Sequence, residues 1–128
     1  MTDETNIDEP AQEPTIDEAL QSRADAISKK LGGVKVHPLL FKENKDGTGD
    51  DIIGFIKEPS RMVKMAILDK SATGMVSAAG ELLEIILIKD ESDPRIYSEG
   101  SDNDKYFMGA AMAAFDTVKI SSNTLKKK

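Results

Sequence analysis

Apolar and polar positions alternate differently in successive parts of the chain, and each pattern predicts an element. Residues 34–41 (VKVHPLLF) and 51–56 (DIIGFI) are rich in β-branched and apolar residues and flank a polar loop that contains glycine, a pattern typical of a β-hairpin. Pro38 has no N–H for a sheet ladder, so the first strand is expected at an edge of the sheet or to end early. Because an isolated hairpin is marginal in water, it is expected to pack on helices or to pair across a subunit boundary.

A helix is predicted before the hairpin. Thr15 and Glu18 have the spacing of a capping box, in which each side chain bonds a backbone N–H that the helix leaves unpaired. Gly32-Gly33 can adopt the left-handed backbone that ends a helix. Between these signals, four apolar residues recur at helical spacing and form one narrow stripe: Leu20, Ala24, Ile27 and Leu31. The stripe requires a partner surface, which is either the rest of the domain or another subunit.

Two helices are predicted after the hairpin. The first begins at Pro59-Ser60, where either Pro59 takes the first helical position or Ser60 caps the helix. The second covers residues 75–88, and its wide apolar arc is typical of a central helix. The buried face of the first of these helices is expected to comprise Met62, Val63, Ala66 and Ile67.

A polar stretch and a last helix follow. Residues 89–104 contain Pro94, Gly100 and several acidic residues, and this composition predicts a loop. The helix expected from about residue 103 to residue 120 carries small residues that allow another helix to approach closely. Across all helices, the residues predicted to lie in the core are Leu83, Ile86, Phe107, Ala111 and Phe115.

Together these elements predict a single α+β domain of residues 15–120, in which a β-hairpin packs on a small helical bundle in the order α-β-β-α-α-α. Residues 1–14 hold acidic residues and prolines with almost nothing apolar. Such a composition cannot offset the entropy of ordering, so these residues are predicted to form a disordered acidic arm. Residues 121–128 end in three lysines and are predicted to be a flexible basic tail.

The composition narrows the range of possible functions. The 128 residues include no Cys, no Trp and one His, so the chain lacks most residue types on which nucleophilic and acid–base catalysis depend. The net charge of −6 disfavours a nucleic-acid-binding surface, which needs clustered Lys and Arg. The longest apolar run, residues 82–88, is far shorter than the ~20 residues of a membrane span. We therefore expect a soluble, non-enzymatic protein that uses no cofactor.

The loop from Asn44 to Asp50 offers the main alternative. Its oxygen-bearing side chains alternate, and a glycine stands at the sixth position, as in the first half of an EF-hand calcium loop. The twelfth position, which should supply a bidentate Glu, is Phe55, and the flanking segments are predicted strands. A hairpin loop rich in Gly and Asp explains the residues without a metal. A small cation-binding or regulatory module that uses this loop stays the second hypothesis.

Other candidate residues also have a structural interpretation. His37 has no second His or Cys with which to bind a transition metal, and it is expected to be a structural or surface residue. The acidic residues between Asp90 and Asp104 are expected to be the solvated charge of a loop and not cation ligands. The pairs Met62 with Met65 and Met108 with Met112 have helical spacing, which favours a role in core packing, although adaptable binding surfaces also use methionine.

One segment resembles a known group of proteins. Residues 53–61 (IGFIKEPSR) resemble the I-G-[YF]-[FI]-K-x-P-[ST]-R junction of small acidic proteins encoded in bacteriophage and prophage structural clusters, in the manner of tail assembly chaperones. Residues 79–83 (AGELL) resemble the A-G-E-x-L-L stretch of the next helix, residues 107–114 resemble the alanine-rich helix after it, and the chain ends in L-K-K-K. The resemblance covers residues 34–128.

The resemblance implies a non-enzymatic protein that binds the tape-measure protein or tail subunits during assembly, usually as an oligomer. It implies a location in the host cytoplasm, or in the virion. It assigns no functional residue. From the apolar helix surfaces we predict a homo-oligomer, with partner-binding residues Leu20, Ala24, Ile27, Leu31, Phe107, Ala111 and Phe115.

Overall fold

The computed structural model describes residues 17–126, with side chains placed through Lys119. The fold is α+β, in the predicted order. Its helices and strands are α1 (Glu18–Lys30), β1 (Val36–Lys42), β2 (Asp51–Lys57), α2 (Arg61–Ser71), α3 (Met75–Ile86) and α4 (Asp104–Lys126). Short 3-10 helices separate α3 from α4: η2 (Lys89–Glu91), η3 (Pro94–Ile96) and η4 (Ser101–Asn103).

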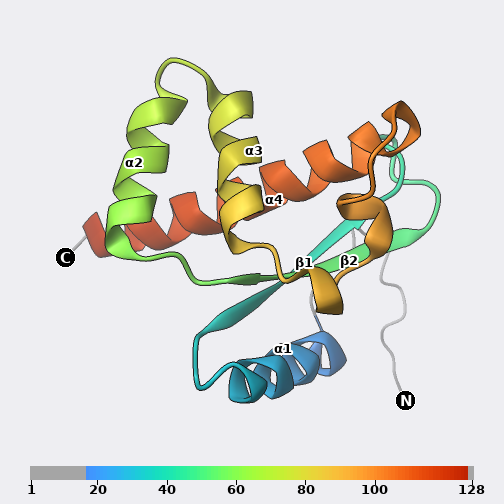
Figure 1. Cartoon of the computed structure of the whole chain (residues 1–128), viewed down its shortest axis with the longest axis horizontal. Coiled ribbons are helices and arrows are strands. Elements are labelled where there is room, and N and C mark those ends of the chain that lie inside the picture. The colour runs from blue at the N-terminus through green and yellow to red at the C-terminus, as the bar shows by residue number, and fades with distance from the viewer. Residues whose placement is uncertain (1–16, 127–128) are drawn as a thin grey trace, which may run out of the picture.

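The hairpin lies between two helical layers, with α1 on one side and α2, α3 and α4 on the other (Figure 1). Leu39 and Ile52 pack into the larger core with α3 and α4, whereas Val36 and Phe55 pack into a smaller core with α1. Both faces of the hairpin are therefore buried. This explains why its strands are almost continuously apolar and do not alternate as strands with one wet face do.

The register of the hairpin leaves one edge of β1 open. The strands pair antiparallel, from Val36 opposite Lys57 to Lys42 opposite Asp51. The Glu43 N–H donates to the Asp50 carbonyl at 2.9 Å, which fixes that pair as hydrogen-bonded. Because hydrogen-bonded pairs alternate along an antiparallel ladder, Leu40 and Lys42 direct their backbone groups away from β2. Pro38 belongs to the same outward set, so its missing N–H costs the ladder nothing, as expected for an edge strand.

The opposite edge, on β2, is closed by residues 87–93. The Ile88 N–H donates to the Phe55 carbonyl and the Asp93 N–H donates to the Ile53 carbonyl, each at 2.9 Å. The hydroxyl oxygen of the buried Ser92 accepts the Phe55 N–H at 3.0 Å. Part of the stretch predicted as a loop is thus built into the fold, whereas Asp90, Glu99, Asp102 and Asp104 are exposed, as expected for the solvated charge of a loop.

The ends of the helices differ in part from expectation. Asp17 caps α1 by accepting the Leu20 N–H at 2.9 Å, while Thr15 of the predicted capping box lies outside the described residues. Ser60 caps α2, which decides between the two predicted starts. Helix α3 ends at Ile86 because Leu87 turns into extended backbone and bridges to β2. Helix α4 continues past residue 120 to Lys126, and the predicted arm of residues 1–14 lies outside the described residues.

The predicted core is confirmed on α3 and α4 and partly wrong on α2. Leu83, Ile86, Ala111 and Phe115 are buried, and Phe107 is half-buried against Gly80 of α3. On α2 the inner face consists of Val63, Ile67 and Leu68. The side chains of Met62 and Ala66, which were expected to lie in the core, are exposed because the neighbours of α2 cover only its other side.

Candidate protein-binding surfaces

The residues predicted to bind partners serve mainly the core of the domain itself. Leu20, Ala24 and Ile27 are buried against the hairpin, and the Arg23 guanidinium lies 5.0 Å from the centre of the Phe55 ring. Leu31, with 39% of its surface exposed, is the accessible member of the stripe. On α4 the predicted partner residues Ala111 and Phe115 are also buried, and Phe107 is partly covered by α3. Of the predicted partner-binding residues, only Leu31 and part of Phe107 are therefore accessible to a partner on the folded domain.

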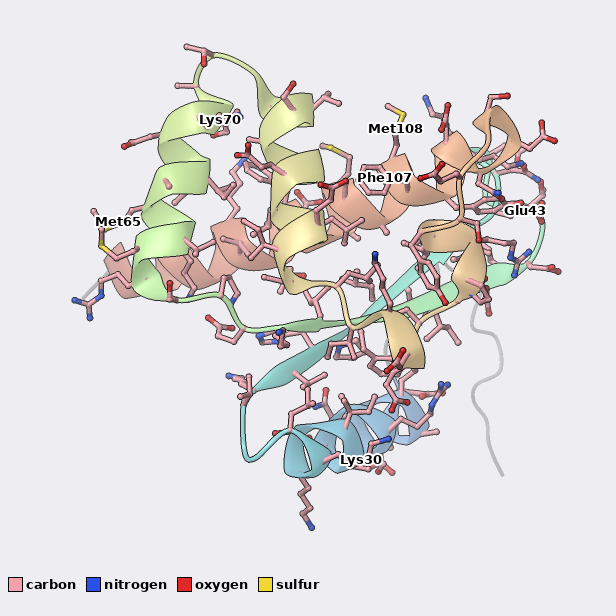
Figure 2. The ribbon with its side chains drawn as sticks, in the orientation of Figure 1. Lys30, Glu43, Met65, Lys70, Phe107 and Met108 are labelled. Carbon is pink, nitrogen blue, oxygen red and sulfur yellow. The ribbon has the colours of Figure 1, made fainter. Side chains whose placement is uncertain are left out.

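One candidate surface is a groove of about 1100 Å³ between β1, the hairpin loop and the first turns of α4, which we call the edge groove. Its lining combines apolar side chains, among them Leu40, Phe41, Met108 and Met112, with charged side chains of both signs, among them Lys45, Lys105, Glu43, Asp46 and Asp104. Figure 2 labels Glu43 and Met108 on this side of the molecule. The groove thus brings together segments that lie about sixty residues apart in the sequence.

Close packing of Phe41 on α4 shapes the apolar part of the groove. A Cβ atom on Gly109 would lie 2.7 Å from Cε2 of the Phe41 ring, so the ring rests on the helix backbone only because residue 109 has no side chain. Met108 projects at the rim with 50% of its surface exposed. Its flexible thioether can adapt to the shape of a bound chain.

The open edge of β1 adds main-chain bonding capacity to this groove. Leu40 and Lys42 line it and direct their N–H and C=O groups away from β2. Within residues 17–126, no backbone group outside β2 bonds to these two residues. An unpaired strand edge is a template for an added extended segment. The missing N–H of Pro38 restricts such pairing to the end of β1 near the loop.

The wall of the groove formed by the hairpin loop is held in place by hydrogen bonds. The Glu43 carboxylate accepts the Asp50 N–H at 3.1 Å and the Tyr106 hydroxyl at 2.8 Å. These bonds hold the pKa of Glu43 below its usual value, and the bond from the Asp50 N–H has the largest effect. Arg95 pairs with Asp93 at 2.8 Å and lies 5.3 Å from the centre of the Tyr106 ring. The loop is therefore anchored to α4 and η3 before any partner arrives.

The side-chain geometry of the same loop does not resemble a calcium site. Asp46 accepts bonds from the hydroxyl of Thr48 at 2.6 Å and from its backbone N–H at 3.0 Å, which lower the pKa of Asp46. Asp50 faces Arg95 at 3.4 Å, and Phe55, at the position of the missing bidentate ligand, is buried. In the described part of the chain, no cluster of three or more His, Asp or Glu side chains could hold a metal ion. This geometry gives the cation-binding hypothesis no support.

His37 has a partner that the sequence did not reveal. Its Nε2 lies 2.5 Å from Oε1 of Glu58, whose other oxygen pairs with Lys64. Burial raises the pKa of Glu58, but the bonds from Lys64 and His37 outweigh this effect and hold the pKa below its usual value. Both carboxylate oxygens are thus engaged, and the trio fixes the junction between β2 and α2. A structural role, as expected for His37, explains this geometry.

The second candidate surface is the outward side of α2, which we call the α2 face and define as Arg61, Met62, Met65 and Asp69. Met62 and Met65 have 71% and 54% of their surface exposed. Figure 2 shows Met65 on the outer side of α2, at the opposite end of the molecule from Glu43. Of the two roles considered for these methionines, their exposure favours a binding surface over core packing.

Comparisons with known proteins add no relative. No protein-family model matches the chain, and no curated protein and no solved structure matches it. Among residues 17–126, no helix combines the length and apolarity that a membrane crossing requires.

Proposed function

We propose that this chain is a non-enzymatic assembly protein that binds an extended segment of a phage or prophage structural protein in the edge groove. The observation that carries the proposal is the open edge of β1 beside the apolar side chains of Phe41 and Met108. An extended segment would hydrogen-bond to the backbone of Leu40 and Lys42 while its side chains contact the apolar lining. In this mode, main-chain bonds supply affinity and side-chain pockets supply specificity.

The class of partner is proposed from the resemblance of residues 53–61 to the junction in tail assembly chaperone-like proteins. The fold gives each part of that junction a structural role. Ile56 lies in the core, Glu58 joins the trio with His37 and Lys64, and Ser60 caps α2. A sequence of this kind preserves a hairpin-to-helix corner, and thereby the orientation of the hairpin on its helices. The proposed partners are the tape-measure protein or tail subunits, bound in the host cytoplasm during assembly or retained in the virion.

A co-purification experiment tests this proposal. The chain is co-expressed with the tape-measure protein and, separately, with a tail subunit encoded in the same cluster. Met108→Lys places a charge at the rim of the groove without entering the core, and we expect it to weaken capture by about tenfold or more. Met75→Lys is the matched control, because Met75 is 45% exposed and lies on α3 outside the groove lining. Capture of neither protein by the wild type, or equal capture by both variants, would contradict the proposal.

A further inference from the structure

The α2 face carries charges in an order that is complementary to itself. Arg61, Met65 and Asp69 are spaced four residues apart, so they follow one side of the helix with a cation before the methionine and an anion after it. The side chains of Arg61 and Asp69 have no ion-pair or hydrogen-bond partner among the described residues. By contrast, Lys70 pairs with Glu81 of α3 at 2.9 Å. The charges of Arg61 and Asp69 on the outward side of α2 are thus available to a partner.

An antiparallel pair of α2 helices satisfies both charges at once. Met65 lies midway between Arg61 and Asp69, which are separated along the helix by about 12 Å at 1.5 Å per residue. A two-fold axis through Met65 would place Arg61 of each copy opposite Asp69 of the other, with the methionines in contact at the centre. A parallel pair would instead place Arg61 against Arg61, which is repulsive. The sequence order of the face therefore selects the antiparallel arrangement.

We propose that the α2 face is a two-fold self-association surface whose occupant is the α2 face of a second copy of this chain. In a symmetric dimer every contact occurs twice, so both ion pairs form together. The proposal goes beyond the proposed function, since it assigns a surface to the homo-oligomer expected from the sequence, and it uses no residue of the edge groove. Each copy keeps its groove free, because the two surfaces lie at opposite ends of the molecule (Figure 2). A dimer would thus present two partner sites.

Charge reversal tests the proposed geometry directly. In a dimer of Arg61→Asp, the new carboxylate would face Asp69 of the other copy at both pairs, and in a dimer of Asp69→Arg, the new guanidinium would face Arg61. We expect each variant alone to lose dimer affinity by about tenfold or more, because like charges then face each other. In an equimolar mixture of the two variants, residue 61 of each copy would face an oppositely charged residue 69 of the other copy, so attraction returns at both pairs. The mixture should therefore form a heterodimer, measured by sedimentation velocity and native mass spectrometry over a concentration series.

The pairing in that mixture follows from the two-fold geometry. Position 61 of one copy faces position 69 of the other, so the Arg61→Asp copy sets its new carboxylate against the new guanidinium of the Asp69→Arg copy. At the second pair, the unchanged Asp69 of the first copy meets the unchanged Arg61 of the second. Recovery of dimer in the mixture thus requires both variants to be folded and their α2 faces to meet. The antiparallel order is tested by dimerisation of the wild type, in which a parallel pair would set like charges against each other.

The outcomes separate this proposal from misfolding and from the proposed function. A wild type that stays monomeric, single variants that dimerise like the wild type, or a mixture without heterodimer would each overturn the proposal. Capture of the tape-measure protein or tail subunit is measured with the same variants. Retained capture without any dimer would refute the α2 pairing alone and leave the edge groove standing.

Discussion

Substitution of two helical glycines tests the packing that forms the edge groove. Replacing glycine by alanine inside a helix stabilises it by roughly 0.5–1 kcal/mol when space permits. At Gly80 the new Cβ would lie 3.4 Å from the Phe107 ring, which is ordinary contact, so Gly80→Ala should stabilise the protein by about that amount. At Gly109 the new Cβ would lie 2.7 Å from Cε2 and 2.9 Å from Cδ2 of Phe41, so the ring must move.

The two substitutions should therefore differ in sign. Overpacking typically costs about 1–3 kcal/mol, which exceeds the helix gain, so Gly109→Ala should destabilise the protein by up to about 2 kcal/mol. The free energy of unfolding from urea titration measures both variants under the same conditions. The displaced ring should also alter the NMR signals of groove residues such as Met108. If Gly109→Ala stabilised the protein as much as Gly80→Ala, Phe41 would not rest on α4 and the groove would not have the described shape.

Three further predictions concern the core and its charges. Leu83→Ala and Phe115→Ala should each lower the free energy of unfolding by roughly 2–5 kcal/mol, because both side chains are buried; a near-zero loss on urea titration would refute the core assignment. Deleting residues 1–33 should unfold the domain, seen as loss of cooperative thermal melting, because α1 covers one face of the hairpin. The pKa of Glu58 is depressed in the folded state, so its contribution to stability is present above its ordinary value of 4.5 and is lost as the pH falls through the folded pKa. Glu58→Gln should therefore destabilise the protein at neutral pH, and its difference from wild type should shrink below pH 4.5 in parallel urea titrations.

The order of elements followed from the sequence because each element carries a strong local signal. The hairpin strands are short apolar runs rich in β-branched residues, the stripe of α1 has a clear helical period, and Ser60 marks a helix start. The inner side of α2 could not be predicted from the sequence, because Met62 and Ala66 have the same spacing as Val63 and Ile67. Only the placement of neighbouring helices decides between these two apolar arcs, and that placement is a property of the whole fold.

The candidate surfaces were harder to foresee than the fold. The edge groove forms where Phe41 meets Gly109, and no local pattern links residues so far apart. The loop between the strands is too long for its length to set their register. The sequence therefore could not predict that the backbone groups of Leu40 point outward, or that His37 pairs with Glu58. The charge order of the α2 face was visible in the sequence. Its meaning required knowing that Met65 lies outside.

The central claim, that an extended segment pairs with the open edge of β1, is tested most directly by amide hydrogen exchange. In the free protein the N–H groups of Leu40 and Lys42 point away from β2 and should exchange faster than those of Leu39 and Phe41, which bond across the ladder. In the complex with the tape-measure protein or tail subunit, exchange at Leu40 and Lys42 should slow strongly. A stable complex in which both amides still exchange as fast as in the free protein would contradict the claim.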